Sequence, residues 1–394
     1  MRLKPAAEKA IRSGHPWVFA GSIREQSGEG TRADLAVIYD RHDKFLAAGL
    51  YDPDSPLRVR VVHLGKPRAI DAEFWRDRLL RAFSKRTNMF DERTTGYRVL
   101  NGESEGMPGM VIDRYGYALV LKIYTACWLP RLAEIVELLS AHSHEQAIVL
   151  RLSRNIQAIA GREYGLADGH ALRGEAVSSQ VVFLEDGLRF QADVLKGQKT
   201  GFFLDQRENR RQVGNLAKGA RVLNCFSFSG GFSLHAARGG AVSVADLDIS
   251  QHALDSAAAN FSLNEGDTRI AGCEHRCIRA NAFDWLQSES RDLFDVIVLD
   301  PPSLAKKRAD RENALKAYRQ LTAAGISRVD GNGILVSASC SAHIGCEEFF
   351  GLVTKTAAES GRRFAEIGRS QHAPDHPAIF PEAEYLKCIY LRME

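Results

Sequence analysis

The segment R-V-L-N-C-F-S-F-S-G-G-F-S, residues 221 to 233, carries the pattern on which the fold prediction depends. A short apolar run leads into a loop with two adjacent glycines, and a helical pattern follows. Gly230 and Gly231 would let the backbone approach a ligand closely and turn into the helix. The segment therefore predicts a strand, a ligand-binding turn and a helix in direct succession.

The same alternation of strand and helix continues toward the C-terminus. Further apolar runs are V-S-V-A-D-L-D (242–248), R-C-I-R-A-N-A (276–282), F-D-V-I-V-L-D (294–300) and G-I-L-V-S-A-S-C (333–340), with helical patterns following most of them. Strands that are apolar along their length are typical of a parallel sheet with helices on both faces. We therefore predict an α/β Rossmann-like domain over residues 179–394.

Two smaller domains are expected before it. Residues 1–68 read as short strands separated by Gly, Asp and Pro, which predicts a small β-rich domain. Residues 69–178 begin with a helical pattern after Asp71, a candidate N-cap, and continue with turns, strands and another helix near 129–140. This pattern predicts a central α+β domain.

Polar residues follow the predicted parallel strands. Ligands of an open parallel sheet bind at the carboxyl ends of its strands. Asp248 lies 18 residues beyond Gly230 and could accept hydrogen bonds from a ribose diol, and Asn281 could pair with an adenine edge. Individually, a Gly-Gly turn is often structural and a strand-end Asp is often a helix cap. The ordered set favours a nucleoside cofactor, and the missing first glycine of G-x-G-x-x-G favours S-adenosylmethionine over a nicotinamide dinucleotide.

The ends of the last two predicted strands carry residues that could take part in a reaction. In D-P-P-S, Pro301 and Pro302 would stiffen a loop that holds Asp300 and Ser303 against a planar base. Cys340 ends the following strand, where it could be a packing residue or a nucleophile. A thiolate that adds to carbon-6 of cytosine makes carbon-5 nucleophilic enough to take a methyl group. Beside the other motifs, we interpret Cys340 as this nucleophile.

The composition indicates the cellular compartment of the protein and the partners it could bind. The N-terminus is too charged for a secretory signal, and no apolar run reaches the roughly 18 residues of a membrane helix. Seven scattered cysteines indicate a reducing compartment, so we expect a cytoplasmic protein without a membrane partner. The segment C-E-H-R-C (273–277) lacks a partner pair for a structural zinc, so we expect no metal and a surface loop before the third strand. Residues 1–100 hold 19 Lys and Arg against 13 Asp and Glu, an excess that could attract phosphates.

Four further segments have distinctive sequences: H-P-W-V-F-A-G-S (15–22), N-G-E-S-E-G-M-P-G-M-V-I-D-R-Y (101–115), G-Q-K-T-G-F-F-L-D-Q-R-E-N-R (197–210) and D-H-P-A-I-F-P-E-A-E-Y-L-K (375–387). With the Gly-Gly loop, L-D-P-P-S and S-C-S, the chain resembles, over nearly its whole length, bacterial 23S rRNA (cytosine-C5)-methyltransferases with an N-terminal PUA-like domain. The resemblance implies a class I methyltransferase domain, S-adenosylmethionine as methyl donor, 23S rRNA as substrate, RNA binding by the PUA-like domain and a homodimer.

The resemblance also implies roles for individual residues. Cys340 falls on the nucleophile and Asp300 on the acid that contacts the base. The implied cofactor positions are Phe226, Ser227, Gly230, Asp248 and Asn281, with Asp205 and Gln206 lining the same cleft. The implied substrate positions are Pro301, Pro302, Ser303, His376 and Lys387. His376 and Lys387, with Tyr385, could instead brace the last strands of the sheet.

Three other functions stay open at this point. An rRNA guanine-nitrogen methyltransferase can use a D-P-P loop without a thiol. A non-catalytic RNA-binding assembly factor could keep a decayed cofactor site. A small-molecule methyltransferase would leave the N-terminal 178 residues without a purpose. Other RNA cytosine-C5 enzymes carry a second Cys in the D-P-P loop, where this chain has Ser303.

Overall fold

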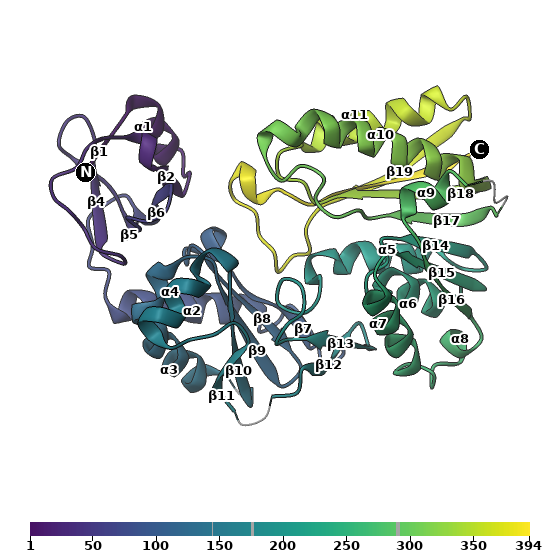
Figure 1. The fold of residues 1–394 in the computed structure, drawn as a ribbon, viewed down its shortest axis with the longest axis horizontal. Helices are drawn as coiled ribbons and strands as arrows, with labels where there is room; N and C mark the ends of the chain where they lie inside the picture. The colour runs from purple at the N-terminus through teal and green to yellow at the C-terminus, as the bar shows by residue number, and fades with distance from the viewer. Residues whose placement is uncertain (144, 175–176, 289–291) are drawn as a thin grey trace. The chain divides into compact units, whose positions relative to one another are not determined.

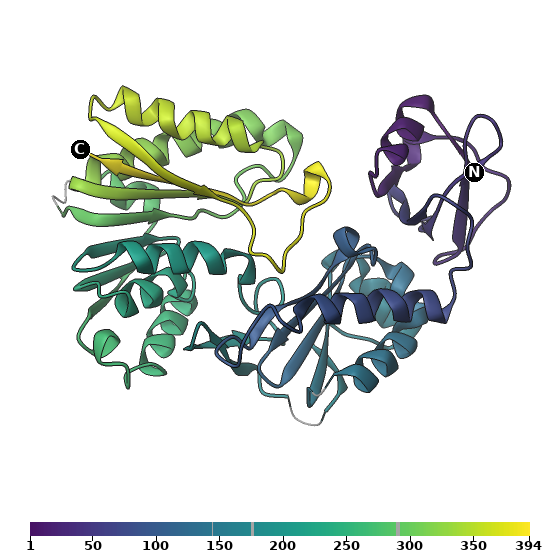
Figure 2. The ribbon, with the colours of Figure 1, turned by 180° about the vertical axis from the view of Figure 1, so that it is seen from behind.

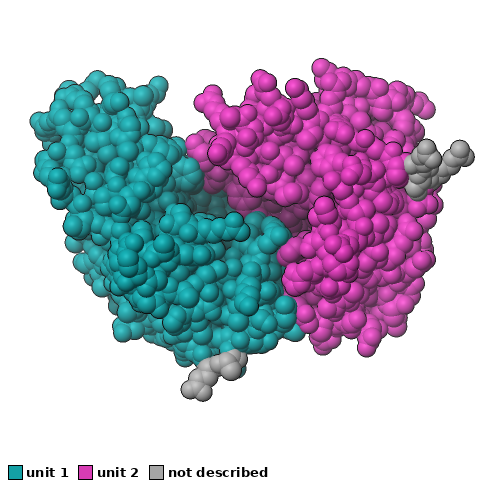
Figure 3. Space-filling model, in the orientation of Figure 1, with its two compact units in different colours: residues 1–186, 192–204, 374–380 teal, residues 187–191, 205–373, 381–394 magenta. Residues whose placement is uncertain are grey.

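The computed structural model describes residues 1–143, 145–174, 177–288 and 292–394. It divides into two compact units, coloured separately in Figure 3. Unit 1 comprises Met1–Asp186, Ala192–Leu204 and Pro374–Phe380, and unit 2 comprises Gly187–Gln191, Asp205–Ala373 and Pro381–Glu394. Among the described helices, none combines the length and apolar character needed to span a bilayer.

Unit 1 begins with a β-rich region, as the sequence predicts. Within residues 2–64, all of them described, strands pair in the order β2-β6-β5-β4-β1-β3. The strands are β1 (Arg2–Leu3), β2 (Trp17–Phe19), β3 (Ile23–Glu25), β4 (Leu35–Tyr39), β5 (Phe45–Tyr51) and β6 (Leu57–Leu64), with the helix α1 at Pro5–Arg12. A small core of aliphatic side chains, including Ile11, Ile38 and Val59, fills the space between α1 and the sheet.

The rest of unit 1 is built on a second sheet, with strand order β11-β10-β9-β8-β7 in the described residues. The strands are β7 (Gly96–Asn101), β8 (Met110–Tyr115), β9 (Ala118–Ile123), β10 (Ala147–Leu152) and β11 (His170–Arg173), and the helices are α2 (Ala72–Arg86), α3 (Leu132–His142) and α4 (Arg154–Tyr164). Asp71 caps α2 by accepting a hydrogen bond from the backbone N–H of Phe74 at 3.0 Å, which confirms the predicted helix start.

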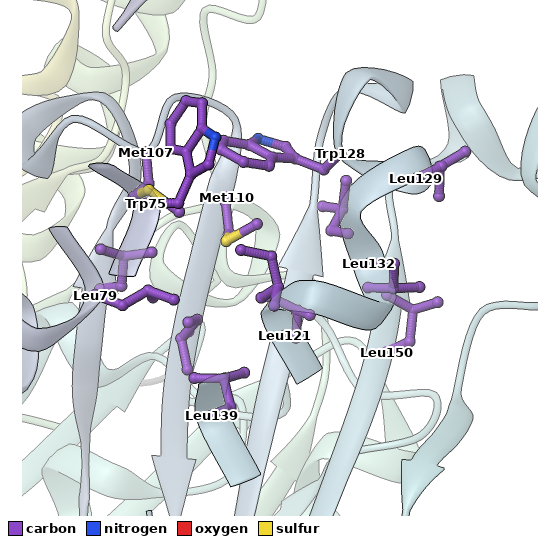
Figure 4. Close-up of a cluster of buried hydrophobic side chains, with 14 of the residues drawn as sticks. Trp75, Leu79, Met107, Met110, Leu121, Trp128, Leu129, Leu132, Leu139 and Leu150 are labelled. Carbon is purple, nitrogen blue, oxygen red and sulfur yellow. The ribbon is translucent and has the colours of Figure 1, made fainter. Parts of the chain in front are cut away.

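One face of this second sheet carries the core of unit 1. Alternate residues of its strands, such as Leu119, Leu121 and Ile123, pack against all three helices in a single buried cluster. Trp75 of α2 and Trp128 lie edge to face in it, with ring centres 5.0 Å apart (Figure 4). Such aromatic pairs add about 0.5–1.5 kcal/mol to the burial of their surface.

A short pair of strands, β12 (Gln180–Glu185) and β13 (Leu188–Asp193), precedes the sheet of unit 2. That sheet has the order β16-β15-β14-β17-β18-β20-β19 in the described residues. Its strands are β14 (Arg221–Cys225), β15 (Ser243–Asp248), β16 (Glu274–Arg279), β17 (Phe294–Leu299), β18 (Val329–Ser339), β19 (Phe364–Ser370) and β20 (Lys387–Met393).

The first five strands of unit 2 are parallel, as predicted, but the last strand is not. β20 runs antiparallel to both β18 and β19, between which it inserts. The sequence of β20, K-C-I-Y-L-R-M, is buried at nearly every position, like the parallel strands. The pattern of apolar residues therefore does not reveal that β20 runs antiparallel to its neighbours.

Helices cover both faces of the sheet of unit 2, as Figures 1 and 2 show from opposite sides. One face packs against α9 (Ala282–Leu286), α10 (Arg311–Arg328) and α11 (Cys346–Glu359) around a single buried cluster. The helices α5 (Arg207–Leu216), α6 (Gly231–Arg238) and α7 (Gln251–Ser262) lie on the other face. The fold is thus the predicted Rossmann-like α/β arrangement.

The segment C-E-H-R-C does not form the expected surface loop, so that prediction is wrong. Residues from Glu274 onward belong to β16, the strand at the edge of the sheet. Edge strands have one free side and commonly carry charged residues, so their sequences look like loops. The described residues contain no group of three or more His, Cys, Asp or Glu placed to hold a metal ion.

Candidate active site

The carboxyl ends of the five parallel strands bring the predicted residues of unit 2 to one edge of the sheet. Cys225 of β14 lies in register with Leu247 of β15 and Leu299 of β17, and Leu299 with Ser337 of β18. The segments that follow these positions therefore emerge side by side. They are the loop 226–230, Asp248, Asn281, the loop 300–303 and Cys340.

The loop after β14 is held in an unusual backbone conformation. Phe226, Phe228 and Gly230 have φ values of 60°, 48° and 72°, in the left-handed region that side chains other than glycine rarely adopt. Glycine adopts this region freely, whereas Phe226 and Phe228 each cost about 1–3 kcal/mol there and persist only because their surroundings hold them. Here the backbone N–H groups of Phe226 and Ser227 donate to the carbonyl of Leu247 at 2.8 and 3.2 Å. The strained turn is therefore pinned to the end of β15.

Asp248 adds a second anchor for this loop. One of its carboxylate oxygens accepts from the backbone N–H of Phe228 at 3.0 Å, and the other from that of Ser250 at 2.9 Å. Each oxygen keeps a further lone pair, so the carboxylate can still accept from a ribose diol. Asn281 caps α9 through its carbonyl oxygen, which accepts from the N–H of Phe283 at 2.9 Å. The cap leaves the amide NH2 group of Asn281 available to an adenine edge.

The loop also has polar atoms that fit a missing ligand. Within the described residues, the hydroxyls of Ser227 and Ser229 are buried and have no hydrogen-bond partner. A buried hydroxyl without a partner costs free energy, so an additional polar group is expected beside each. At Gly230, a Cβ atom would come within 2.8 Å of Ala257 and 2.9 Å of the Asp246 carboxylate. The glycine therefore keeps the loop packed closely against β15 and α7.

A buried charged network beneath the loop was not predicted from the sequence. Asp246, fully buried in β15, accepts from Asn224 at 2.9 Å and from Ser233 of α6 at 2.6 Å. Its other oxygen lies 2.9 Å from Nε2 of His275, whose ring stacks on Phe261 of α7 at 3.7 Å between ring centres. The histidine of C-E-H-R-C thus supports the floor of the glycine loop.

Cys340 and the D-P-P-S loop lie together at the ends of β18 and β17. The Cys340 thiol is 3.8 Å from the carbonyl oxygen of Pro301. The hydroxyl of Ser341, which is fully buried, accepts from the backbone N–H groups of Leu304 and Ala305 at 3.2 and 3.3 Å. It also lies 3.3 Å from the hydroxyl of Ser303. Ser341 therefore fastens the segment that carries Cys340 to the loop that carries Asp300.

Tyr318 of α10 also contacts Ser341. Its hydroxyl is 3.1 Å from that of Ser341, and its side chain is buried. Burial raises the pKa of Tyr318 to about 12. Negative charge on Cys340 and Asp300 acts in the same direction, so both groups lie within electrostatic range of Tyr318. Its position in the helical pattern of α10 gave no sign of this role.

Lys387 is buried behind Cys340. Its ammonium group donates to the carbonyls of Ser341 and Ile344 at 2.7 and 2.6 Å, and so holds the chain that follows the thiol. Burial lowers the pKa of Lys387, whereas negative charge on Cys346 and Cys340 opposes that shift. This burial favours the bracing role for Lys387. A cation near Cys340 also favours the thiolate form of its side chain.

The remaining candidates are buried as well. His376 belongs to unit 1, where its Nδ1 lies 3.1 Å from the carboxylate of Asp375. The contact of His376 with the substrate stays a prediction. In unit 2, the Tyr385 hydroxyl donates to the Asp205 carboxylate at 2.7 Å, and Gln206 accepts from Asn209. The first bond places Asp205 beside the C-terminal segment of unit 2, whereas the second is local to the start of α5.

All seven cysteines are free thiols, and their surroundings distinguish them. Cys225 and Cys388 are fully buried, and burial raises the pKa of Cys388 to about 12. Cys340 and Cys346 are half-buried. Cys346 begins α11 and accepts from the side-chain amide of Gln371 at 3.3 Å. Of these two half-buried thiols, Cys340 is the one next to the D-P-P-S loop.

Two family models match the chain. A model described as S-adenosylmethionine-dependent methyltransferase matches residues 160–392. A model described as PUA-like domain matches residues 1–63. The first match contains the glycine loop, the D-P-P-S loop and Cys340, and it covers more than half of the chain.

Named relatives and solved structures agree with these matches. A "Ribosomal RNA large subunit methyltransferase" from Deinococcus radiodurans is 53% identical over 100% of this chain and 97% of its own length. A "Ribosomal RNA large subunit methyltransferase I" from Shewanella amazonensis is 34% identical over 100% of this chain and 99% of its own length. A Streptococcus mutans protein described as a SAM-dependent methyltransferase has the same fold, with a TM-score of 0.83, 21% identity and coverage of 100% and 99%. A methyltransferase structure complexed with SAH matches equally well.

Proposed function

Because this chain belongs to the S-adenosylmethionine-dependent methyltransferase family and carries a PUA-like N-terminal domain, we propose that it methylates carbon-5 of a cytosine in 23S rRNA. The cofactor is S-adenosylmethionine. The names of the relatives support ribosomal RNA of the large subunit as the substrate class. The choice of cytosine carbon-5 rests on Cys340 and its surroundings.

In the proposed reaction, the residues around the glycine loop hold the cofactor. Gly230 permits close approach of the backbone, Asp248 accepts from the ribose, Asn281 faces the adenine, and the hydroxyls of Ser227 and Ser229 gain polar partners. Phe226 is proposed to contact the cofactor, and Asp205 and Gln206 to line the same cleft. Bound S-adenosylmethionine supplies an electrophilic methyl group.

The proposed chemistry at the base begins with Cys340. Its thiolate adds to carbon-6 of the cytosine, and the electron pair of the carbon-5–carbon-6 double bond makes carbon-5 nucleophilic toward the methyl group. Carbon-5 takes the methyl group as the carbon–sulfur bond of the donor breaks and S-adenosylhomocysteine leaves. A general base then removes the carbon-5 proton, and elimination of the Cys340 thiolate restores the aromatic base. The Asp300 carboxylate, held by Pro301 and Pro302, accepts hydrogen bonds from the amino edge of the cytosine. The Lys387 ammonium favours the attacking thiolate.

The observation that carries this proposal is the position of the Cys340 thiol, 3.8 Å from the carbonyl oxygen of Pro301. A guanine-nitrogen methyltransferase needs a D-P-P loop but no thiol beside it. In this chain Ser341 and Lys387 hold the thiol-bearing segment against that loop. A thiol kept only for packing would not need these two attachments.

The proposal includes the organisation of the chain. We propose a PUA-like RNA-binding domain at residues 1–68, a central domain at 69–178 and the methyltransferase domain at 179–394. The target base must leave its stack to reach a pocket at strand ends, so single-stranded or loop RNA is the expected substrate form. A cytoplasmic homodimer is the proposed working state.

Nucleoside mass spectrometry tests the reaction. Purified protein is incubated with isotopically labelled S-adenosylmethionine and protein-free 23S rRNA from a strain that lacks the gene. Labelled 5-methylcytidine that disappears in Cys340→Ala is the expected result. Label in a methylguanosine would contradict carbon-5 chemistry and favour the guanine-nitrogen alternative. Absence of both label and S-adenosylmethionine binding would favour a non-catalytic RNA-binding factor.

A further inference from the structure

A basic pocket in unit 1 has no role in the chemistry described above. It encloses about 430 Å³ between β6, the helix α2 and the turn before β8. Segments from distant parts of the chain meet in it: Gly14 and Pro16, the strand end 61–64, residues 103–106, and Ile379. Pro16, residues 103–106 and Ile379 belong to the distinctive segments 15–22, 101–115 and 375–387, and none of these lining residues has a part in the proposed chemistry.

The charges around the pocket are unbalanced. Its two carboxylates, Glu103 and Glu105, already have cationic partners. Arg60 lies 3.0 Å from Glu103, and Arg86 and Lys85 lie 2.5 and 3.3 Å from Glu105. The same pocket is lined by Arg78 and Arg81, which make no ion pair with any carboxylate among the described residues. The lining itself therefore holds three cations, Arg78, Arg81 and Lys85, against two carboxylates, and Arg60 and Arg86 from outside the lining already pair with those carboxylates.

Arg78 is held in this pocket although its neighbours repel it. Its guanidinium lies over the ring of Phe74 at 4.3 Å, and Arg68 lies over the same ring at 4.8 Å. Burial and, to a smaller extent, the positive charges of Arg81 and Arg68 lower the pKa of Arg78 to about 10. Its Nε atom is buried without a hydrogen-bond partner among the described residues. Another guanidinium nitrogen of Arg78 donates to the carbonyl of Val62, and an anion in the pocket would relieve the repulsion among the three arginines.

Gly106 keeps the space that the arginine head occupies. Its φ is 76°, and a Cβ atom there would lie 1.4 Å from a terminal nitrogen of Arg78. The turn G-E-S-E-G therefore admits the guanidinium only because its last residue is glycine. The pocket is thus formed by backbone geometry as well as by charge.

We propose that this pocket binds a phosphodiester group of the RNA substrate. The inference rests on the proposed function, because it takes the polyanion to be the RNA that the enzyme methylates. Arginine heads are well suited to phosphate oxygens, which they bind in pairs of parallel hydrogen bonds. The exposed Arg81 and Lys85 stand at the rim, where a long chain of phosphates can continue across the surface. The contact positions the RNA and carries no base specificity.

The test compares two variants of the full-length protein. Arg81→Gln removes an exposed pocket charge that has no ion-pair partner. Arg76→Gln removes the same charge from the same helix, but Arg76 lies outside the pocket and pairs with Glu73 at 3.6 Å. Affinity for a labelled single-stranded RNA oligonucleotide is measured over a range of salt concentrations. S-adenosylmethionine affinity is measured by calorimetry in parallel.

Loss of one phosphate contact should make the dependence of log affinity on log salt shallower by about 0.7, which is about a fivefold loss of affinity near ~0.1 M salt. We expect this loss in Arg81→Gln, parental behaviour in Arg76→Gln and unchanged cofactor affinity in both. Equal losses in the two variants would overturn the site in favour of diffuse charge. Inorganic phosphate that competes at micromolar concentration, at constant ionic strength, with the parent but not with Arg81→Gln would assign the pocket to a small free anion instead.

Failure of this inference is distinguishable from failure of the proposed function. If the parent methylates rRNA while both variants bind RNA like the parent, only the pocket assignment is refuted. If the parent itself neither binds the RNA nor methylates rRNA, the proposed function is refuted.

Discussion

Replacing Ser341 with alanine should loosen the loop that faces the nucleophile. The serine hydroxyl accepts from the N–H groups of Leu304 and Ala305 at 3.2 and 3.3 Å and lies 3.1 Å from the Tyr318 hydroxyl. Alanine leaves all three groups without this partner inside the protein. Because these bonds are long, each loss is taken at about 1 kcal/mol, near the lower end of the range for unsatisfied buried groups. The free energy of unfolding should therefore fall by about 2–3 kcal/mol.

The same free energy holds the D-P-P-S loop in place, so the methylation rate should fall as well. About 1.4 kcal/mol corresponds to a factor of ten, so a reduction in kcat of roughly 30-fold or more is expected. Urea denaturation and methyl transfer at saturating S-adenosylmethionine measure the two effects. Ser327→Ala is the matched control, because Ser327 is exposed on α10 and its hydroxyl donates to the carbonyl of Ala324 in the same helix at 2.8 Å. If Ser341→Ala has the stability and rate of Ser327→Ala, this reasoning is refuted.

Two further predictions concern the thiol and the cofactor. Lys387→Met should move the acid limb of the kcat–pH profile to higher pH by roughly one unit, because loss of a nearby cation raises the pKa of the Cys340 thiol. Lys387→Arg keeps the cation and should return the limb part of the way to its parental position. An acid limb that does not move in Lys387→Met would contradict this role. Gly230→Ala should weaken S-adenosylmethionine binding by at least about tenfold in calorimetry. An alanine there must keep a left-handed φ, and its Cβ atom clashes with Ala257, at a cost of about 1–3 kcal/mol. Gly219→Ala is its control, with a φ of 73° and nothing within 4 Å; equal binding by the two variants would show that the clash is unimportant.

Much of the catalytic sheet was predictable because its chemistry follows its strands. Four of the five parallel strands, β14, β15, β17 and β18, are largely buried apolar runs, and all five are followed by the polar residue or loop that the structure brings to one edge. The start of α2 was equally predictable, since an Asp at the N-cap satisfies a free backbone N–H group. In these places local sequence and final structure are governed by the same interactions.

Other features depend on partners that are far away in the sequence. The start of β16 looked like a loop because the single neighbour of an edge strand leaves charged residues exposed on it, whereas the strand from residue 276 onward was predicted. For Lys387 the sequence allowed either a contact with RNA or a bracing role, and the pairing of β20 with β18 buries its ammonium group. In the sequence, Ser341 is only the neighbour of Cys340. Its hydrogen bond from Leu304, 37 residues away in the loop after β17, is visible only in the structure. The basic pocket combines residues from five separate segments, so no local pattern could indicate it.

Covalent trapping tests the central claim most directly. A 23S rRNA transcript that contains 5-fluorocytidine carries no carbon-5 proton, so an enzyme that has methylated carbon-5 cannot eliminate its thiolate. After incubation with S-adenosylmethionine and digestion of the RNA, peptide mass spectrometry locates the adduct. We predict a methylated 5-fluorocytidine adduct on Cys340 in the parent protein and in Cys346→Ala, and none in Cys340→Ala. Absence of an adduct, or an adduct on Cys346, would contradict the assignment of Cys340 as the nucleophile.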